Sequence, residues 1–221
     1  MYPKLELMSA LHHVLRPFLE QHKFKARRPI REQDERNKIL CPVYRIRRKV
    51  CIHTMDVQYD SFSTWFCVNM GVHFRFLPCT FNEELPKPNM MDSAMCIFTQ
   101  RLSPDAGDHW WQVFESRDAT FESVHDATRV LSESGLAFFD AYGNLPGPYA
   151  SISVASLDSG EYKAFMPRTS IACSPVRIAS MMAYISKHFG KNEASKEFAQ
   201  YALSKVVVRL RPHMEKYLRF L

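Results

Sequence analysis

Apolar and polar residues alternate along the stretch from Thr64 to Phe76. One side of this stretch carries Phe66, Val68, Met70, Val72, Phe74 and Phe76, and the other carries Trp65, Cys67, Asn69, Gly71, His73 and Arg75. Successive side chains of a β-strand point to opposite faces, so the pattern predicts a strand with one buried face. The opposite face offers an amide, an imidazole and a guanidinium, which could serve a binding site or simply face water.

Further patterns predict the elements on either side of this central strand. Before it we expect an amphipathic helix over residues 4–22, kinked or broken at Pro17, and two strands over residues 40–47 and 49–59. After it we expect a long surface loop over residues 77–92, a strand over residues 94–102 and a helix over residues 118–134 that Gly135 ends.

A linker signal divides the chain. Residues 144–149 read Asn-Leu-Pro-Gly-Pro-Tyr, which is typical of a connection between domains. Residues 1–145 are predicted to form an α+β domain, with an antiparallel sheet of about four or five strands and helices on one face. Residues 150–221 are predicted to form a helical region, a helical hairpin plus a terminal helix, after at most a short strand or hairpin at 152–160. Ser174 with Pro175 should open the hairpin's first helix, and Gly190 should end it.

Composition and charge exclude few classes of protein. The 221 residues carry a formal net charge of +6, a bias that is compatible with an acidic partner but too small to imply nucleic-acid binding. The six cysteines, at positions 41, 51, 67, 79, 96 and 173, form no C-x-x-C pair. No signal peptide and no run of about 20 apolar residues is evident, so the expected location is the cytoplasm.

The sequence offers no recognisable catalytic or metal-binding motif. Cys67 and His73 share one face of the central strand but lie six residues, or roughly 20 Å, apart, too far for a nucleophile and its base. His53 and His73 could approach each other across paired strands, but no third metal ligand is evident. We therefore expect no catalytic residue, no metal and no cofactor.

The polar side of the central strand is the candidate binding site. Asn69, His73 and Arg75 form its row, and Arg101 from the next strand, with Gln58 or Asp56 from the preceding one, could join it. Trp65 and one of Trp110 and Trp111 could form its rim, because two adjacent tryptophans point to different sides. Such a groove would suit a peptide, an acidic side chain or a small anion. The alternative is an ordinary solvated sheet face.

The order of these elements resembles a known family. The matching features are Phe24, Lys25 and Arg28 after the first helix, Tyr44 and Arg45, Gln58, the Phe66, Val68, Asn69 and Gly71 strand, Arg101 with Leu102, the Trp110 and Trp111 pair, and Gly135, Leu136, Phe138 and Phe139. Together they resemble the uncharacterised bacterial family named domain of unknown function 4304, over residues 4–145. The family usually has Gly where this chain has Lys23. The resemblance implies a fold but no activity.

These observations favour a non-catalytic binding protein. The expected partner is a protein, such as a toxin with an acidic surface that this chain would neutralise as an immunity protein. One alternative is an enzyme or binder that acts on a nucleotide or another anionic small molecule through His73, Arg75 and Asn69. Another is a structural or regulatory module that forms homo-oligomers through the C-terminal helices.

Overall fold

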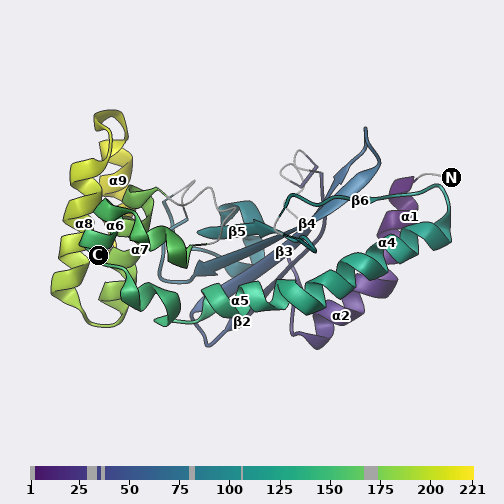
Figure 1. Cartoon of the computed structure of the whole chain (residues 1–221), viewed down its shortest axis with the longest axis horizontal. Coiled ribbons are helices and arrows are strands. Elements are labelled where there is room, and N and C mark those ends of the chain that lie inside the picture. Colours follow the sequence, from purple (N-terminus) through teal and green to yellow (C-terminus); the bar gives the residue numbers. More distant parts are fainter. Residues whose placement is uncertain (1–2, 29–33, 36–37, 80–82, 106, 167–173) are drawn as a thin grey trace.

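An antiparallel sheet forms the centre of the molecule. The computed structural model describes residues 3–28, 34–35, 38–79, 83–105, 107–166 and 174–221. Within them, the strands pair in the order β1 (Lys25–Ala26), β2 (Ile39–Arg47), β3 (Cys51–Asp60), β4 (Trp65–Phe74) and β5 (Phe98–Arg101). Figure 1 shows β2 to β5. The short β6 (Trp111–Gln112) pairs with the start of β4, on the edge that β5 also uses. The strands that flank the predicted central strand are thus hydrogen-bonded to it.

Helices cover one face of this sheet. α1 (Pro3–Ala10) packs against α4 (Arg117–Val130), and α5 (Leu136–Gly143) packs on β3 and β4 (Figure 1). The apolar row of β4, from Phe66 to Phe74, is fully buried in the core that these helices close. The predicted α+β fold, with helices on one face of an antiparallel sheet and a helical C-terminal region, is therefore confirmed.

Two π-helical turns fit the helices to the sheet. The turn Leu11–Leu15 joins α1 to α2 (Arg16–Gln21), and Pro17 lies directly after it, in the first turn of α2. The predicted break at Pro17 is absent: the chain stays helical from Pro3 to Gln21, and the π-helical turn just before Pro17 is a local irregularity in it. The second turn, Leu131–Gly135, joins α4 to α5.

Gly135 does not end its helix, so that prediction was wrong. A Cβ atom at this position would lie 2.6 Å from Cδ1 of Leu131 and 3.1 Å from the sulfur of Met70 on β4. The glycine therefore lets the helix approach the sheet closely and continue to Gly143. The helix also begins one residue earlier than expected, at Arg117, because Ser116 caps it.

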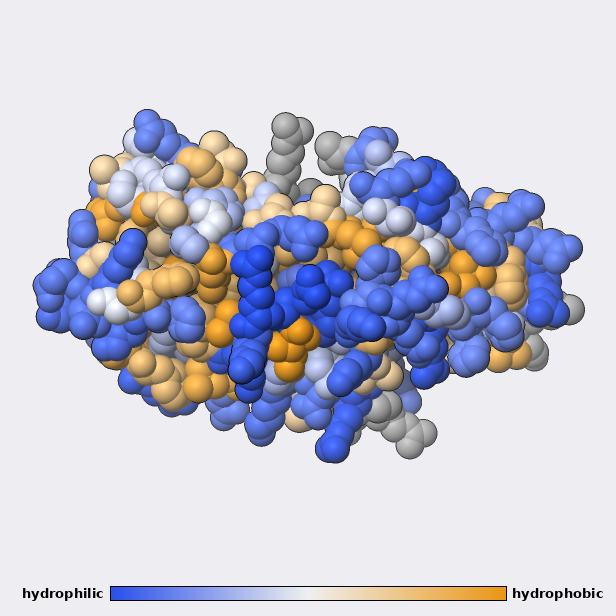
Figure 2. All heavy atoms as spheres, turned by 90° about the horizontal axis from the view of Figure 1, so that it is seen from below, coloured by the Kyte–Doolittle hydropathy of each residue, from blue (hydrophilic) through white to orange (hydrophobic). Residues whose placement is uncertain are grey.

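The turn between β2 and β3 is strongly basic. Arg48 and Lys49 both have positive φ angles, 49° and 63°, which suit a tight hairpin turn. Their side chains and that of Arg47 are exposed. Figure 2, which shows the molecule from below, has hydrophilic residues gathered where Figure 1 places this turn. These charges thus lie at the end of the sheet, at the turn between β2 and β3.

The chain between β4 and β5 covers one end of the sheet face that lies opposite the helices. We call this connection the covering chain. Leu77, Cys79, Met91 and Cys96 are buried, and three of them form a small second core with Ile52 of β3. The predicted surface loop is therefore partly a cover for the sheet, with residues 80–82 outside the described part. The strand expected over residues 94–102 is shorter, because a 3₁₀ turn occupies Ser93–Met95.

In the described part of the chain, four α-helices follow the sheet region: α6 (Val154–Ser159), α7 (Pro175–His188), α8 (Asn192–Lys205) and α9 (Arg211–Leu218). Ser174 caps α7 and Gly190, at φ 71°, follows its end, as predicted. The strand or hairpin predicted at 152–160 was wrong, because Ser153 and Ser156 form a capping box that starts α6.

The predicted division of the chain near residue 145 stays a prediction. Tyr149 of the expected linker is fully buried, with its ring 5.9 Å from that of Phe74 and 5.6 Å from that of Phe98. Figure 1 places α8 and α9 at one end of an elongated molecule and α1 at the other. Among the described helices, none has the length and apolar character that a bilayer span requires.

Candidate functional site

A recess opens on the sheet face that the helices leave uncovered. Its volume is about 490 Å³, and it is lined by Lys38, Ile39, Asp56, Gln58, Tyr59, Asp60, Asn69, Ser93, Ala94 and Trp110. We call it the polar recess. It lies beside the covering chain described above, so the cover forms one wall and the strands β3 and β4 form the floor. Because most of its residues carry amides, carboxylates or hydroxyls, its floor can bind a polar group in several orientations.

A buried carboxylate lies at the floor of the polar recess. Asp56 of β3 is 1% exposed and is directly paired with Asn69 of β4. Its Oδ1 accepts a hydrogen bond from Nδ2 of Asn69 at 3.1 Å, and its Oδ2 accepts one from the backbone N–H of Ser93 at 3.0 Å. Burial raises the pKa of Asp56 above its usual value, although these hydrogen bonds oppose the rise. Both carboxylate oxygens are thus held in place by the fold.

A second amide side chain lies beside Asn69 on the floor of the recess. Nδ2 of Asn69 also lies 3.5 Å from Oε1 of Gln58, and the thiol of Cys67 is near both amide side chains. Burial raises the pKa of Cys67 to about 12, so this thiol stays protonated at neutral pH and is a poor nucleophile. The floor therefore supplies hydrogen bonds and no activated nucleophile.

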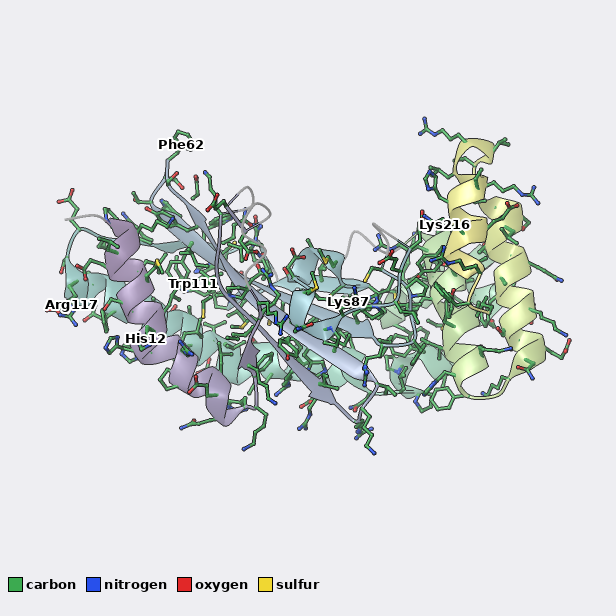
Figure 3. All side chains as sticks on the ribbon, turned by 180° about the vertical axis from the view of Figure 1, so that it is seen from behind. His12, Phe62, Lys87, Trp111, Arg117 and Lys216 are labelled. Carbon is green, nitrogen blue, oxygen red and sulfur yellow. The ribbon has the colours of Figure 1, made fainter. Side chains whose placement is uncertain are left out.

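Aromatic side chains form the edge of the recess. Trp110 lines the polar recess and also, with Trp65, Asp60 and Ser63, an adjoining hollow of about 270 Å³. Trp65 is 38% exposed and Trp110 is half-buried. Phe62, at the tip of the β3–β4 hairpin, is 92% exposed and projects from the molecule in Figure 3. We call Phe62, Trp65 and Trp110 the aromatic rim.

Two cations hold this rim in position. The guanidinium of Arg101 lies 4.6 Å from the ring of Trp110, forms an ion pair with Asp108 and donates to Oδ1 of Asn69 at 3.4 Å. Nζ of Lys38 lies 4.8 Å from the ring of Phe62. It also pairs with Asp60 at 3.2 Å. The rim is thus joined to the floor through Arg101 and to β3 through Lys38.

The structure brings together four of the seven residues that the sequence nominates. Asn69, Arg101, Trp65 and Trp110 meet at the recess and its rim, as the strand register requires: Asn69 pairs directly with Arg101. Trp111 lies in the core and donates its indole N–H to Asp126. The adjacent tryptophans therefore do point to different sides, and Trp110 is the one at the site.

His73 and Arg75 lie outside the recess. His73 is fully buried under the covering chain, where its Nδ1 accepts from Ile97 N and its Nε2 donates to Leu77 O. Burial lowers its pKa to about 4, so it is neutral and structural. Arg75 lies beyond the end of β4, exposed, and donates to Lys49 O at 3.2 Å.

The predicted approach of His53 to His73 was wrong. In the β3–β4 register His53 pairs with Val72 and Ile52 pairs with His73, so the two imidazoles lie on opposite faces. His53 stacks on Phe139 of α5 under the helices. Among the described residues there is no group of three His, Cys, Asp or Glu side chains that could hold a metal ion.

Sequence reasoning missed Lys38, Asp60 and Ser93 at the recess. Lys38 precedes β2 and reaches the site because its neighbour Ile39 pairs with Gln58. Ser93 arrives through the covering chain, which no periodicity predicts. A register deduced from hydrophobic alternation alone could have found Asp60, directly opposite Trp65, but not Ser93.

The fold and the recess define an α+β sheet domain whose open face has a polar floor and an aromatic rim. Residues 41–141 match the family described as "Domain of unknown function (DUF4304)", so this part of the chain is a DUF4304 domain. The match begins in β2 and ends in α5, whereas the resemblance was expected over residues 4–145. No curated protein and no solved structure matches the chain.

Three of the residues that carry the family resemblance pack together. The guanidinium of Arg45 is buried between aromatic rings, 4.5 Å from the centre of Phe24 and 5.3 Å from that of Phe139. Its Nε donates to Nδ1 of His53. These contacts join α5 to the sheet, so this part of the resemblance reflects the fold and not the recess.

Proposed function

We propose that this protein is a non-catalytic binding module that holds a partner protein at the polar recess and its aromatic rim. The observation that carries the proposal is that Trp65 and Trp110, from β4 and the β5–β6 connection, line one hollow beside a hydrogen-bonding floor. Tryptophan is the residue type most enriched among side chains that dominate protein–protein affinity. Here both indoles are partly exposed and can be buried by a partner.

The floor supports binding better than catalysis. Both oxygens of Asp56 already accept hydrogen bonds, His73 is buried away from the recess, and Cys67 stays protonated. Each group is thus held by the fold, and none is placed to take a proton from a substrate. A preorganised row of amides and a carboxylate would instead select a polar segment of the partner.

An immunity protein that neutralises a cognate bacterial toxin is the form of this function that we favour. The partner would be a folded protein that buries the aromatic rim. The immunity protein would act by covering the surface through which that partner exerts its own activity. The exposed rim and the preorganised floor support this choice, because an inhibitor of this kind needs a rigid contact face that changes little on binding.

The proposed function is tested by capture of the partner from native lysate with the tagged protein. Trp65→Ala and Trp110→Ala should each lose a partner that the wild type retains in stoichiometric amount. The matched control is Phe189→Ala, another exposed aromatic, which lies after α7 at the C-terminal end of the molecule. Retention of the partner by both tryptophan variants would contradict the proposal, as would recovery of a small anionic ligand and no protein.

A further inference from the structure

A second hollow lies among the C-terminal helices, apart from the polar recess. Its volume is about 370 Å³, within the range of roughly 300–1,000 Å³ typical of ligand pockets. Its apolar lining consists of Val176 from α7, Val206, Val207 and Leu210 from the connection between α8 and α9, and Met214 from α9. We call it the C-terminal groove.

The fold leaves apolar side chains unburied at this groove. α8 ends at Lys205, and Pro212 lies in the first turn of α9, so the chain between them makes only a single 3₁₀ turn. Val207 is 56% exposed, Leu210 is 46% exposed and the neighbouring Val208 is 87% exposed. A contiguous apolar segment beside a hollow is typical of an interaction surface.

Cations outnumber acids around this groove. Residues 174–221 hold nine Lys or Arg and three Asp or Glu, whereas residues 1–173 hold 20 of each kind. The whole net charge of +6 is therefore carried by the C-terminal helices. Arg177 and Lys205 bring two of these positive charges to the lining of the groove.

The one acidic residue of the groove is already paired. Glu83, which comes from the covering chain, lies 2.6 Å from Nζ of Lys216 and 2.9 Å from Nδ1 of His213. Two of the nearby cations also have acidic partners: Lys205 pairs with Asp158 and Arg211 pairs with Glu215, both at 3.2 Å. These pairs neutralise part of the positive charge, but the nine Lys and Arg of residues 174–221 outnumber the three Asp and Glu there, so the surface stays positive.

From the apolar lining and the positive surround, we propose that the C-terminal groove binds an acidic amphipathic helical segment of a partner protein. Apolar residues spaced three and four apart on that segment would fill the groove, and its Asp and Glu residues would meet the cations. A second copy of this chain fits less well, because two surfaces that each carry the full positive charge repel each other. This inference is independent of the proposed function, since the two surfaces share no residue.

The test uses three labelled helical peptides of equal length. The first has Leu at the apolar positions and Glu at the others, the second replaces Glu by Gln, and the third keeps Glu and replaces Leu by Ser. Fluorescence anisotropy with the full chain should show binding of the first peptide. The other two should bind at least about tenfold more weakly, and added salt should weaken the first.

Two variants of equal charge change locate the binding. Leu210→Glu should abolish binding of the first peptide, whereas Leu5→Glu, on exposed α1 at the opposite end of the molecule, should leave it unchanged (Figure 1). Circular dichroism confirms that each variant is folded. The inference is overturned if no peptide binds, if the Gln peptide binds as well as the Glu peptide, or if Leu210→Glu has no effect. It is also overturned if the chain dimerises through a contact that Leu210→Glu removes.

Discussion

The side chain of Asn69 on β4 donates a hydrogen bond to the carboxylate of Asp56 directly across from it on β3, at 3.1 Å. The oxygen of the same amide accepts a hydrogen bond from Arg101, whose guanidinium lies over Trp110. One side chain therefore connects the buried acid of the recess floor to the aromatic rim. This connection explains how an open sheet face can hold a fixed geometry without a covering helix.

Asn69→Ala removes this connection and leaves Asp56 with one hydrogen-bond donor fewer. Because the carboxylate is buried, we expect the free energy of unfolding to fall by about 1–3 kcal/mol. Urea denaturation measures this change. Asn192→Ala, at an exposed position in the first turn of α8, should change it by less than about 0.5 kcal/mol. Equal effects of the two substitutions would show that the Asp56–Asn69 pair has no special role.

The buried His73 should make the fold sensitive to acid. Its pKa is about 4 in the folded protein and 6.5 as its ordinary value, so the unfolded chain takes up a proton first as the pH falls. The stabilisation is fully present above pH 6.5 and is lost progressively between about pH 6.5 and 4. His73→Gln should flatten the dependence of unfolding free energy on pH in this window. An unchanged slope in the variant would argue against this role of His73.

The contribution of Asp56 to stability depends on pH in the opposite direction to that of His73. Its folded pKa is raised above the ordinary 3.8, so the folded state holds its proton more strongly than the unfolded chain. The contribution of Asp56 to stability is therefore largest below pH 3.8 and declines as the pH rises through its folded pKa. Relative to Asp56→Asn, the wild type should lose unfolding free energy as the pH rises above 3.8. A difference that is constant with pH would contradict the assignment.

Gly71 allows the covering chain to lie directly on β4. A Cβ atom there would lie 2.6 Å from both the sulfur of Cys96 and Oγ1 of Thr54, so Gly71→Ala should cost about 1–3 kcal/mol of unfolding free energy. Gly107→Ala, which meets only Asp105, is the control. The double variant Gly71→Ala/Cys96→Ala should lose less unfolding free energy than the sum of the losses in the two single variants. Strict additivity would mean that Gly71 and Cys96 do not compete for the same space.

The central strand, the order of its neighbours and the α7 boundaries follow from local signals. Alternation over Trp65–Phe74 requires one buried face, and Ser174, Pro175 and Gly190 act within one turn of the helix that they delimit. Gly135 was misread because its role depends on Met70, far away in the sequence. A glycine looks the same in a sequence whether it ends a helix or lets the helix touch a sheet.

Only the part of the candidate site that lies on paired strands could be predicted from the sequence. Asn69 and Arg101 meet because they are paired, and Trp65 shares their face. His73 belongs to the same row but is buried, because the chain after Leu77 folds back over that end of the sheet. Alternation identifies which residues share a face, but not which part of that face a long connection will cover.

The binding of a partner protein at the recess is tested most directly by hydrogen exchange of the captured complex. Amides of residues 58–69 at the β3–β4 hairpin and of residues 107–112 at the β5–β6 connection should exchange more slowly in the complex than in the free protein. Complexes formed by Phe189→Ala should show the same protection. Protection confined to α7–α9, or none at the hairpin, would contradict the claim that the aromatic rim is the contact.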